Sequence, residues 1–277
     1  MVYPLKYSIK ELNRITRNAR LKIVEMIHES GSGHPGGSLS AIDLLIVLYF
    51  NIMKHDPKIP KWKKRDRFVL SKGHCCPALY TVLALTGYFQ KEELLTFRKM
   101  GSRLQGHPHM LKLPGIEIST GSLGQGLSVA NGMALSFKMD KKPNRVFCMV
   151  GDGELDEGQI WEGVSTAGHY KLDNVIMIVD NNNLQIDGKV DEVKMKNPID
   201  RRLESFGWQT VTLNGHDLKE IESGFKRGLK CKNRPFAIIA KTVKGKGVSF
   251  MENKAGWHGR SPDEDEYRQA LQELGED

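Results

Sequence analysis

Apolar residues follow two patterns along the chain: short continuous runs, and longer runs with helical spacing. The continuous runs lie at residues 67–71, 145–150, 174–180, 209–213 and 235–243. Runs without polar alternation are typical of strands that are buried on both faces, as in a parallel sheet. We therefore expect these segments to form the strands of a mainly parallel sheet.

Segments with helical spacing lie before, between and after these strands. They cover residues 10–28, 40–50, 76–88, 123–139, 160–170 and 261–274. Ser40 is placed to cap the second of these helices, and Gly87 to end the third. Alternating strands and helices at this spacing predict a doubly wound α/β fold, with helices on both faces of the sheet. Because no linker or repeat interrupts the pattern, we expect one domain over residues 1–277.

The composition is that of an ordinary globular chain, with 39% hydrophobic and 27% charged residues among 277. The first residues, MVYPLKYSIKEL, lack the apolar centre of a signal peptide. We expect no apolar stretch of the roughly 18 residues that cross a membrane, and hence a cytoplasmic chain with no membrane contact. The four cysteines form no CxxC pair, which predicts free, buried thiols rather than a zinc site or disulfides.

The net charge of +8 raises the question of nucleic-acid binding. The densest basic run, residues 54–67, contains Trp62 as a candidate stacking residue. Two prolines and two aspartates interrupt this run, and no recognition motif surrounds it. We interpret it as a solvated loop and expect no nucleic-acid partner. Excess positive charge also steers small anionic substrates.

A glycine-rich segment, GSGHPG at 31–36, has the spacing of a dinucleotide-binding motif. That motif works only where a strand turns into a helix beside a pyrophosphate. Here the segment follows a helix and contains Pro35. With no P-loop in the chain either, a nicotinamide or P-loop site is not expected.

A second glycine-rich segment, GDGELDEG at 151–158, directly follows a predicted strand and is acidic. Its carboxylates would repel a phosphate unless a cation lay between them. Mg²⁺ takes oxygen ligands and commonly bridges carboxylates to substrate phosphates. Asp152 supplies such a carboxylate, and Asn181, Asn182 and Asn183 follow the next strand. Ligands of parallel sheets bind at these strand ends, so the pair predicts a magnesium and phosphate site.

Six motifs in order extend this pattern across residues 30–190. They are SGHPGGSLS, LSKGHCCPALYTVLALTGY, QGHP, TGSLGQGLSVANGMA, GDGELDEGQIWEG and DNNNLQIDG. Together they resemble the N-terminal, thiamine diphosphate-binding section of transketolases, and KTVKGKGVSFMENKAGWHG extends the likeness to about residue 259.

The resemblance implies a cofactor, thiamine diphosphate, and a metal ion held by this chain. Asp152, Asn182 and the backbone oxygen of Leu184 correspond to the metal ligands, for Mg²⁺ or for Ca²⁺ or Mn²⁺ in its place. Gly153 corresponds to a donor to the diphosphate through its backbone N–H.

Further cofactor contacts follow from the same likeness. His74 corresponds to a histidine that contacts the cofactor. Gly121, Ser122 and Leu123 correspond to the loop beside the aminopyrimidine ring. Many members of the family have proline at the Ser122 position, which leaves a backbone role unaffected.

The resemblance also implies a catalytic set. His34, His107 and His258 correspond to histidines that contact substrate oxygens or the cofactor, work that suits imidazole near neutral pH. Glu157 corresponds to an acid that meets the partner's catalytic glutamate across a subunit interface. Neighbouring Glu154 and Asp156 are given no role and are expected to be solvated. The remaining histidines are expected to be structural or exposed, namely His28, His55, His109, His169 and His216.

The likeness covers only the N-terminal section of transketolases, which continue into a domain that holds the aminopyrimidine ring. It therefore implies a split transketolase that transfers a two-carbon ketol unit between sugar phosphates, with a C-terminal subunit as partner in an α₂β₂ assembly. Three alternatives remain open at this point: the α subunit of a 2-oxo acid dehydrogenase, a relative of 1-deoxyxylulose-5-phosphate synthase, and a non-catalytic scaffold of the same fold.

Overall fold

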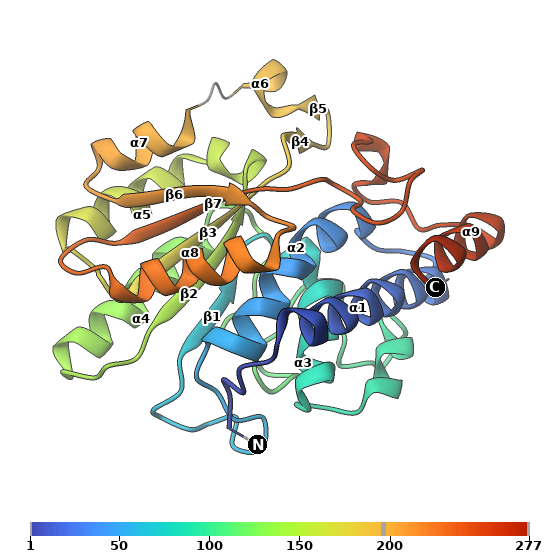
Figure 1. Cartoon of the computed structure of the whole chain (residues 1–277), viewed down its shortest axis with the longest axis horizontal. Coiled ribbons are helices and arrows are strands. Elements are labelled where there is room, and N and C mark those ends of the chain that lie inside the picture. Colours follow the sequence, from blue (N-terminus) through green and yellow to red (C-terminus); the bar gives the residue numbers. More distant parts are fainter. Residues whose placement is uncertain (1, 195–197, 276–277) are drawn as a thin grey trace.

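A five-stranded parallel sheet runs through the centre of the molecule (Figure 1). The computed structural model describes residues 2–194 and 198–275. The strand order is β1-β2-β3-β7-β6. Their bounds are β1 Arg67–Leu70, β2 Val146–Gly151, β3 Val175–Asn181, β6 Gln209–Asn214 and β7 Phe236–Lys241. The predicted fold class and all five predicted strands are confirmed.

Helices cover both faces of this sheet. Side chains of β2 alternate between them: Phe147 and Met149 belong to one buried cluster, and Val146, Cys148 and Val150 to the other. The first cluster takes up α1 (Ile9–Ser30), α2 (Pro35–Val47), α3 (Cys76–Thr86) and α8 (Leu218–Lys230). The second takes up α4 (Gly126–Met139), α5 (Gly158–His169) and α7 (Ile199–Ser205).

The remaining elements lie at the margins. Helix α9 (Glu264–Gly275) packs along α1, where Ala270 and Leu274 are buried (Figure 1). A small hairpin, β4 (Leu184–Gln185) and β5 (Gly188–Lys189), follows β3 and leads into the short helix α6 (Val190–Val193). Helix α8 was not among the predicted segments.

The N-terminus of α2 differs from the prediction. The helix begins at Pro35, five residues before Ser40, because proline is favoured in the first helical turn. Glycine is required at position 36 because a side chain would collide there: a Cβ would lie 2.8 Å from the carbonyl oxygen of Trp257. Ser40 is therefore not a cap. Its hydroxyl donates to the Asp180 carboxylate over 2.6 Å.

The expectation about apolar length also needs correction. Helix α2 continues into a π-helical turn, Leu48–Ile52, and residues Pro35–Ile52 form one helix long and apolar enough to cross a membrane. Every residue of this stretch is buried within the protein. Its hydrophobicity is that of a helix at the centre of a core.

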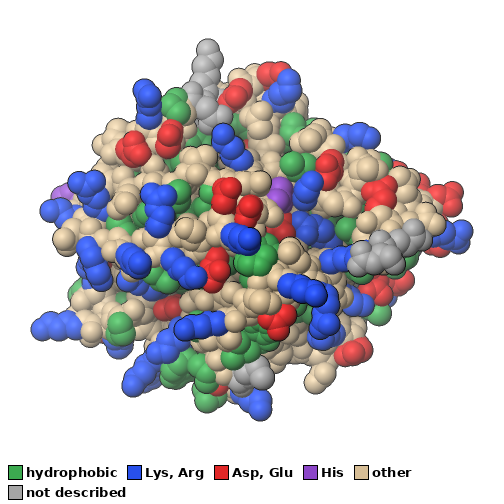
Figure 2. Space-filling model, viewed as in Figure 1, with side chains coloured by type: hydrophobic (Ala, Val, Ile, Leu, Met, Phe, Trp, Pro, Cys, Tyr) green, Lys and Arg blue, Asp and Glu red, His purple; other side chains and the backbone are tan. Residues whose placement is uncertain are grey.

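Of two expectations drawn from composition, one agrees with the structure and the other agrees in part. All four cysteines are free and buried. In the basic run, the lysines Lys58, Lys61, Lys63 and Lys64 are exposed, as expected for a solvated loop, but His55, Asp56, Arg65 and Asp66 are buried. Figure 2 shows lysine and arginine side chains spread over the viewed face with acidic side chains between them.

Candidate active site

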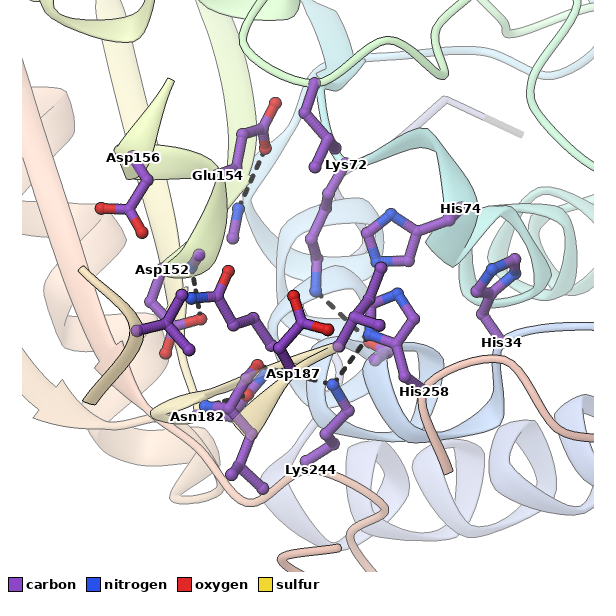
Figure 3. A pocket seen from close by; sticks show the side chains of 18 of the residues that line it. His34, Lys72, His74, Asp152, Glu154, Asp156, Asn182, Asp187, Lys244 and His258 are labelled. Atoms are coloured by element: carbon purple, nitrogen blue, oxygen red, sulfur yellow. Dashed lines mark hydrogen bonds between the residues drawn. The ribbon is translucent and has the colours of Figure 1, made fainter. Parts of the chain in front are cut away.

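The register of the sheet brings three distant segments to one edge. Gly151 at the end of β2 pairs with Asp180 in β3, and Asn181 pairs with Lys241 in β7. The chain segments that follow these residues surround a cavity of about 440 Å³ (Figure 3). The cavity therefore lies at the carboxyl ends of the strands, as expected for a parallel sheet.

Asp152 forms the acidic part of the cavity and is almost completely buried. One carboxylate oxygen accepts the backbone N–H of Gly153 over 2.9 Å, and the other accepts the N–H of Asn183. Burial, together with the nearby Asp180 carboxylate, raises the pKa of Asp152 to about 7. A cation beside this carboxyl group would stabilise its ionised form.

The oxygen atoms predicted as metal ligands lie on this wall of the cavity. Asn182 is buried, its side-chain oxygen accepts the N–H of Leu184 over 3.1 Å, and both residues line the cavity with Asp152. In the described part of the chain, no group of three His, Cys, Asp or Glu side chains forms a metal site. One carboxylate with neutral oxygens suits Mg²⁺, which keeps several waters and substrate oxygens in its coordination sphere. The donor set fits that ion.

A buried lysine and aspartate form a second network below the cavity. The Lys72 ammonium is paired with the Asp180 carboxylate, which also accepts hydroxyl hydrogens from Ser40 and Thr242. Burial alone would lower the pKa of Lys72, but Asp180 raises it above its usual value. Lys72 lines the cavity and therefore places a permanent positive charge there.

A second lysine, Lys244, reaches the cavity from the segment after β7. Its ammonium lies 3.0 Å from Nδ1 of His258 and 3.5 Å from the backbone oxygen of Leu184 (Figure 3). Because an ammonium only donates, Nδ1 of His258 accepts and its proton lies on Nε2. Sequence analysis assigned no role to Lys72 or Lys244, although both lie within motifs that carried the resemblance.

Three histidines from separate segments, His34, His74 and His258, gather at the end of the cavity away from Asp152 (Figure 3). The ring centres lie 4.9 Å apart for His74 and His258, 5.2 Å for His34 and His74, and 5.5 Å for His34 and His258. His107 lies 6.3 Å from His34 and against Gly121, where a Cβ would be 3.2 Å from its ring. The structure thus brings three of the predicted histidines together at the cavity, and His107 lies beside them without lining it.

The environment keeps these imidazoles neutral. Burial, with the charge of Arg98 next in effect, lowers the pKa of His34 to about 4. Burial and Lys244 lower the pKa of His258 to about 3. Burial also lowers the pKa of His74 far below its usual value and that of His107 to a lesser degree. Neutral imidazole can donate from one nitrogen and accept at the other, as proton transfer requires.

The predicted aminopyrimidine loop lies beside this cluster. Gly121 and Leu123 line the cavity, whereas Ser122 is exposed. The histidines that were expected to be structural or exposed, His28, His55, His109, His169 and His216, do not line it.

The acidic residues after Asp152 differ sharply in environment. Glu157 is exposed at the rim of the cavity, where it could meet another chain. Glu154, which was expected to be solvated, is buried and accepts from the Ser71 hydroxyl at 2.5 Å and the N–H groups of Gly124 at 2.8 Å and Gly151 at 3.1 Å. That prediction is wrong, because the tertiary fold places three donors around this carboxylate.

Comparison with known proteins agrees with this geometry. The family described as "Transketolase, thiamine diphosphate binding domain" matches residues 12–277. The chain therefore belongs to the transketolase family and represents its thiamine diphosphate-binding domain. The sequence-based assignment to transketolases, which transfer ketol groups, is confirmed.

Two similar relatives are themselves single subunits. The chain is 45% identical to the 6-deoxy-6-sulfo-D-fructose transketolase subunit SqwG of Clostridium sp. (strain MSTE9), covering 91% of each chain. It is 41% identical to a subunit of the apulose-4-phosphate transketolase of Phocaeicola vulgatus, covering 97% of this chain and 95% of that one.

Full-length transketolases are also similar, but they are much longer. The crystal structure of transketolase from Campylobacter jejuni superimposes with a TM-score of 0.92 at 37% identity, covering 97% of this chain and 43% of that one. The human enzyme is 40% identical over 98% of this chain and 43% of its own length. This chain spans about two fifths of a full-length enzyme.

Proposed function

We propose that this chain is the thiamine diphosphate-binding subunit of a split transketolase, which acts with a second, C-terminal subunit. The observation that carries the proposal is the arrangement of one cavity. Oxygen donors for a cation lie at one end, neutral histidines at the other, and two lysines between them. A cofactor with a diphosphate, a divalent cation and a reactive ring matches this polarity.

In this proposal, the acidic end of the cavity holds Mg²⁺ and the diphosphate. Asp152, the Asn182 amide oxygen and the Leu184 carbonyl oxygen are the protein ligands of the ion, and Ca²⁺ or Mn²⁺ can replace it. The Gly153 N–H faces the same region and serves the diphosphate. Lys72 and Lys244 balance the negative charge of the cofactor, since both ammonium groups lie at the cavity wall.

At the other end of the cavity, the histidines bind the sugar substrate. Thiamine diphosphate, when bound, supplies the electron sink for breaking the C2–C3 bond of a ketose. His34, His107 and His258 hydrogen-bond the sugar hydroxyls and move protons to and from them, for which their neutral state prepares them. His74 contacts the cofactor itself, together with the backbone of Gly121, Ser122 and Leu123.

The partner subunit completes the cofactor cleft from the open side. Exposed residues Glu157, Ile186 and Val193 lie around the cavity, and exposed apolar side chains at a rim favour contact with another chain. We propose that the partner carries the aminopyrimidine-binding domain and a glutamate that meets Glu157. Two copies of each subunit form an α₂β₂ assembly, in keeping with the prevalence of two-fold symmetry.

The substrates in this proposal are a ketose phosphate donor and an aldose phosphate acceptor. Relatives are named for a sulfonated sugar in one case and a phosphorylated sugar in another. In this proposal, this chain contacts sugar hydroxyl groups, which both kinds of substrate have.

The test is calorimetric titration of thiamine diphosphate into the assembled enzyme with and without Mg²⁺. We expect binding that requires Mg²⁺ and is abolished by Asp152→Ala, with retained fold by circular dichroism. Asp140→Asn is the matched control, since Asp140 is exposed and paired with nearby Lys142. Equal affinity in the Asp152→Ala and control variants would refute the metal site.

The partner requirement has its own test. Ketol transfer is assayed with saturating cofactor and Mg²⁺ for this chain alone, and again after adding the C-terminal subunit. We expect activity only in the mixture. Full turnover by this chain alone would contradict the split-enzyme proposal.

A further inference from the structure

Arg98 lies between the two loops that carry His34 and His107, and sequence analysis gave it no role. It follows the 3₁₀ helix Lys91–Thr96 and has a left-handed backbone conformation, with φ of 57°. Its N–H donates to the Leu104 carbonyl oxygen over 2.9 Å. A residue other than glycine with positive φ is uncommon, and surrounding contacts must hold it there.

The guanidinium group of Arg98 joins the two histidine loops. Nη1 donates to the Ser32 hydroxyl oxygen at 2.6 Å, and Nη2 to the Gly106 carbonyl oxygen at 3.5 Å. Ser32 lies two residues before His34, and Gly106 immediately precedes His107. One rigid, planar group thus connects segments that are more than 70 residues apart in sequence.

Gly106 gives this guanidinium the space that it occupies. A Cβ at position 106 would lie 2.8 Å from Nε and 3.0 Å from Cζ of Arg98. Real Cβ atoms do not come so close to another heavy atom, so a side chain at position 106 would shift the end of the Arg98 side chain away from the loop. The absence of a side chain at 106 and the arginine at 98 therefore form one structural unit.

The charge of Arg98 acts on the same two histidines. After burial, Arg98 is the next cause that lowers the pKa of His34, followed by His107 and Lys244. For His107, the charge of Arg98 again adds to burial in lowering the pKa. Arg98 thus contacts both histidine-bearing segments, and its charge adds to the burial that lowers the pKa of both imidazoles.

We infer that Arg98 is a positioning residue, which fixes His34 and His107 relative to each other so that both imidazoles meet the same sugar. This inference rests on the proposed function, because it assigns a purpose to the spacing of two histidines at the substrate end. Displacement of about 1 Å at a reacting group can cost about 100-fold in rate. Loss of the guanidinium should therefore affect the sugar reaction and leave cofactor binding intact.

The test uses the assembled holoenzyme with its partner subunit and three variants, Arg98→Met, Arg98→Lys and Gly106→Ala. In each we expect kcat/KM for the ketose donor to fall about 10- to 100-fold, with the Kd for thiamine diphosphate within about twofold. Lysine should not restore activity, because it keeps the charge but cannot hydrogen-bond Ser32 and Gly106 at once from one planar group. Gly106→Ala should reproduce the loss without changing any charge.

Arg103→Met is the matched control. Arg103 belongs to the same segment, but its guanidinium is exposed and bound by Glu93, with both contacts at 2.7 Å. We expect its kinetics to match the wild type. An equal loss in Arg103→Met would show that any disturbance of this segment is sufficient, and would overturn the inference.

A double-mutant cycle separates positioning from a general structural effect. If Arg98 acts through the histidines, adding Arg98→Met to the His34→Ala/His107→Ala variant should cause a further fall in kcat/KM of less than about twofold. Independent effects would instead multiply. A full 10- to 100-fold additional loss would overturn the inference.

A crystal structure of the Gly106→Ala assembly gives a readout that does not depend on activity. We expect the His34 and His107 rings to separate or rotate relative to the wild type, while Asp152 and Asn182 stay in place. Unchanged rings would overturn the inference even in an active enzyme. Failure of the wild-type assembly to bind thiamine diphosphate would instead refute the proposed function, while displaced rings would still support the role of Arg98.

Discussion

The buried pair of Lys72 and Asp180 should be among the most costly features of this protein to disturb. Their side chains are 3% and 0% exposed. In an Asp180→Asn variant, the Lys72 ammonium would lose its charged partner and keep neutral acceptors, among them the Gly37 carbonyl oxygen at 3.4 Å. The Ser40 and Thr242 hydroxyls would lose their charged acceptor as well.

The magnitude follows from the burial of both groups. Breaking a buried pair by removing one partner costs about 3–5 kcal/mol, because a charge is left without compensation. A typical domain has a free energy of unfolding of about 5–15 kcal/mol. We therefore expect Asp180→Asn and Lys72→Met each to remove about 3–5 kcal/mol of that free energy. The double variant should lose about 2 kcal/mol less than the sum of the two.

The pH chosen for the measurement follows from the shifted pKa values of Asp180 and Lys72. Burial alone would raise the pKa of Asp180, but Lys72 lowers it below its usual value. Its contribution is therefore complete above the unfolded pKa of about 4 and is lost as the pH falls further. The pKa of Lys72 is raised, so its contribution is lost only at strongly alkaline pH. At pH 7 the pair contributes in full.

The assay is urea unfolding at pH 7, followed by the fluorescence of the four tryptophans and analysed by linear extrapolation. Lys138→Met is the control, since Lys138 pairs with Asp173 at 2.9 Å and the two side chains are 39% and 23% exposed. Such a surface pair contributes less than about 1 kcal/mol. Costs below 1 kcal/mol for the buried variants, or costs that simply add in the double variant, would refute the reasoning.

Three further predictions concern other parts of the chain. Burial lowers the pKa of His55 to about 4, whereas the pKa of histidine in an unfolded chain is about 6.5. As the pH falls from about 6.5 to 4, His55 is protonated in the unfolded chain but not in the folded one, which lowers the free energy of unfolding by about 3 kcal/mol. Urea unfolding at pH 7 and 4 should show that dependence reduced by this amount in His55→Gln, and an equal dependence in both proteins would contradict it. Gly168→Ala would place a Cβ 1.9 Å from the Phe206 carbonyl oxygen and should lower the free energy of unfolding by about 3 kcal/mol. Gly132→Ala, on an open helix surface, should raise it by about 0.5–1 kcal/mol. A thermal unfolding experiment that ranks the two variants in the opposite order would be evidence against this packing. Glu154→Gln replaces one of two acceptor oxygens with a donor and should weaken thiamine diphosphate binding about tenfold, which calorimetry of the assembled enzyme checks, with unchanged affinity as the contrary result.

The amino-acid sequence determined the sheet and the location of the cavity. Continuous apolar runs marked β1, β2, β3 and β7, because strands buried on both faces have no polar side to interrupt them. The fifth predicted strand, β6, lies at the edge of the sheet and is mostly not buried. GDG and DNNN each followed a predicted strand, and parallel strands end at one edge. The sequence alone therefore places Asp152 and Asn182 together.

The local sequence pattern was less informative where tertiary contacts determine where a helix begins. The helix was predicted over residues 40–50, after Gly36 and Gly37, yet α2 begins at Pro35. A Cβ at Gly37 would lie 2.6 Å from Cys75 Sγ, so these glycines serve close packing of the helix. That requirement comes from a segment far along the chain.

Only the tertiary structure revealed what surrounds the predicted residues. Glu154 lies only three residues before exposed Glu157 in the same acidic segment, but its carboxylate accepts from Ser71, Gly124 and Gly151. Lys72 reaches Asp180 over 108 positions, and Arg98 reaches Ser32 over 66. Periodicity reports which face of an element is buried. It carries no information on which polar side chains from distant loops meet at a site, because the packing of the whole chain determines those encounters.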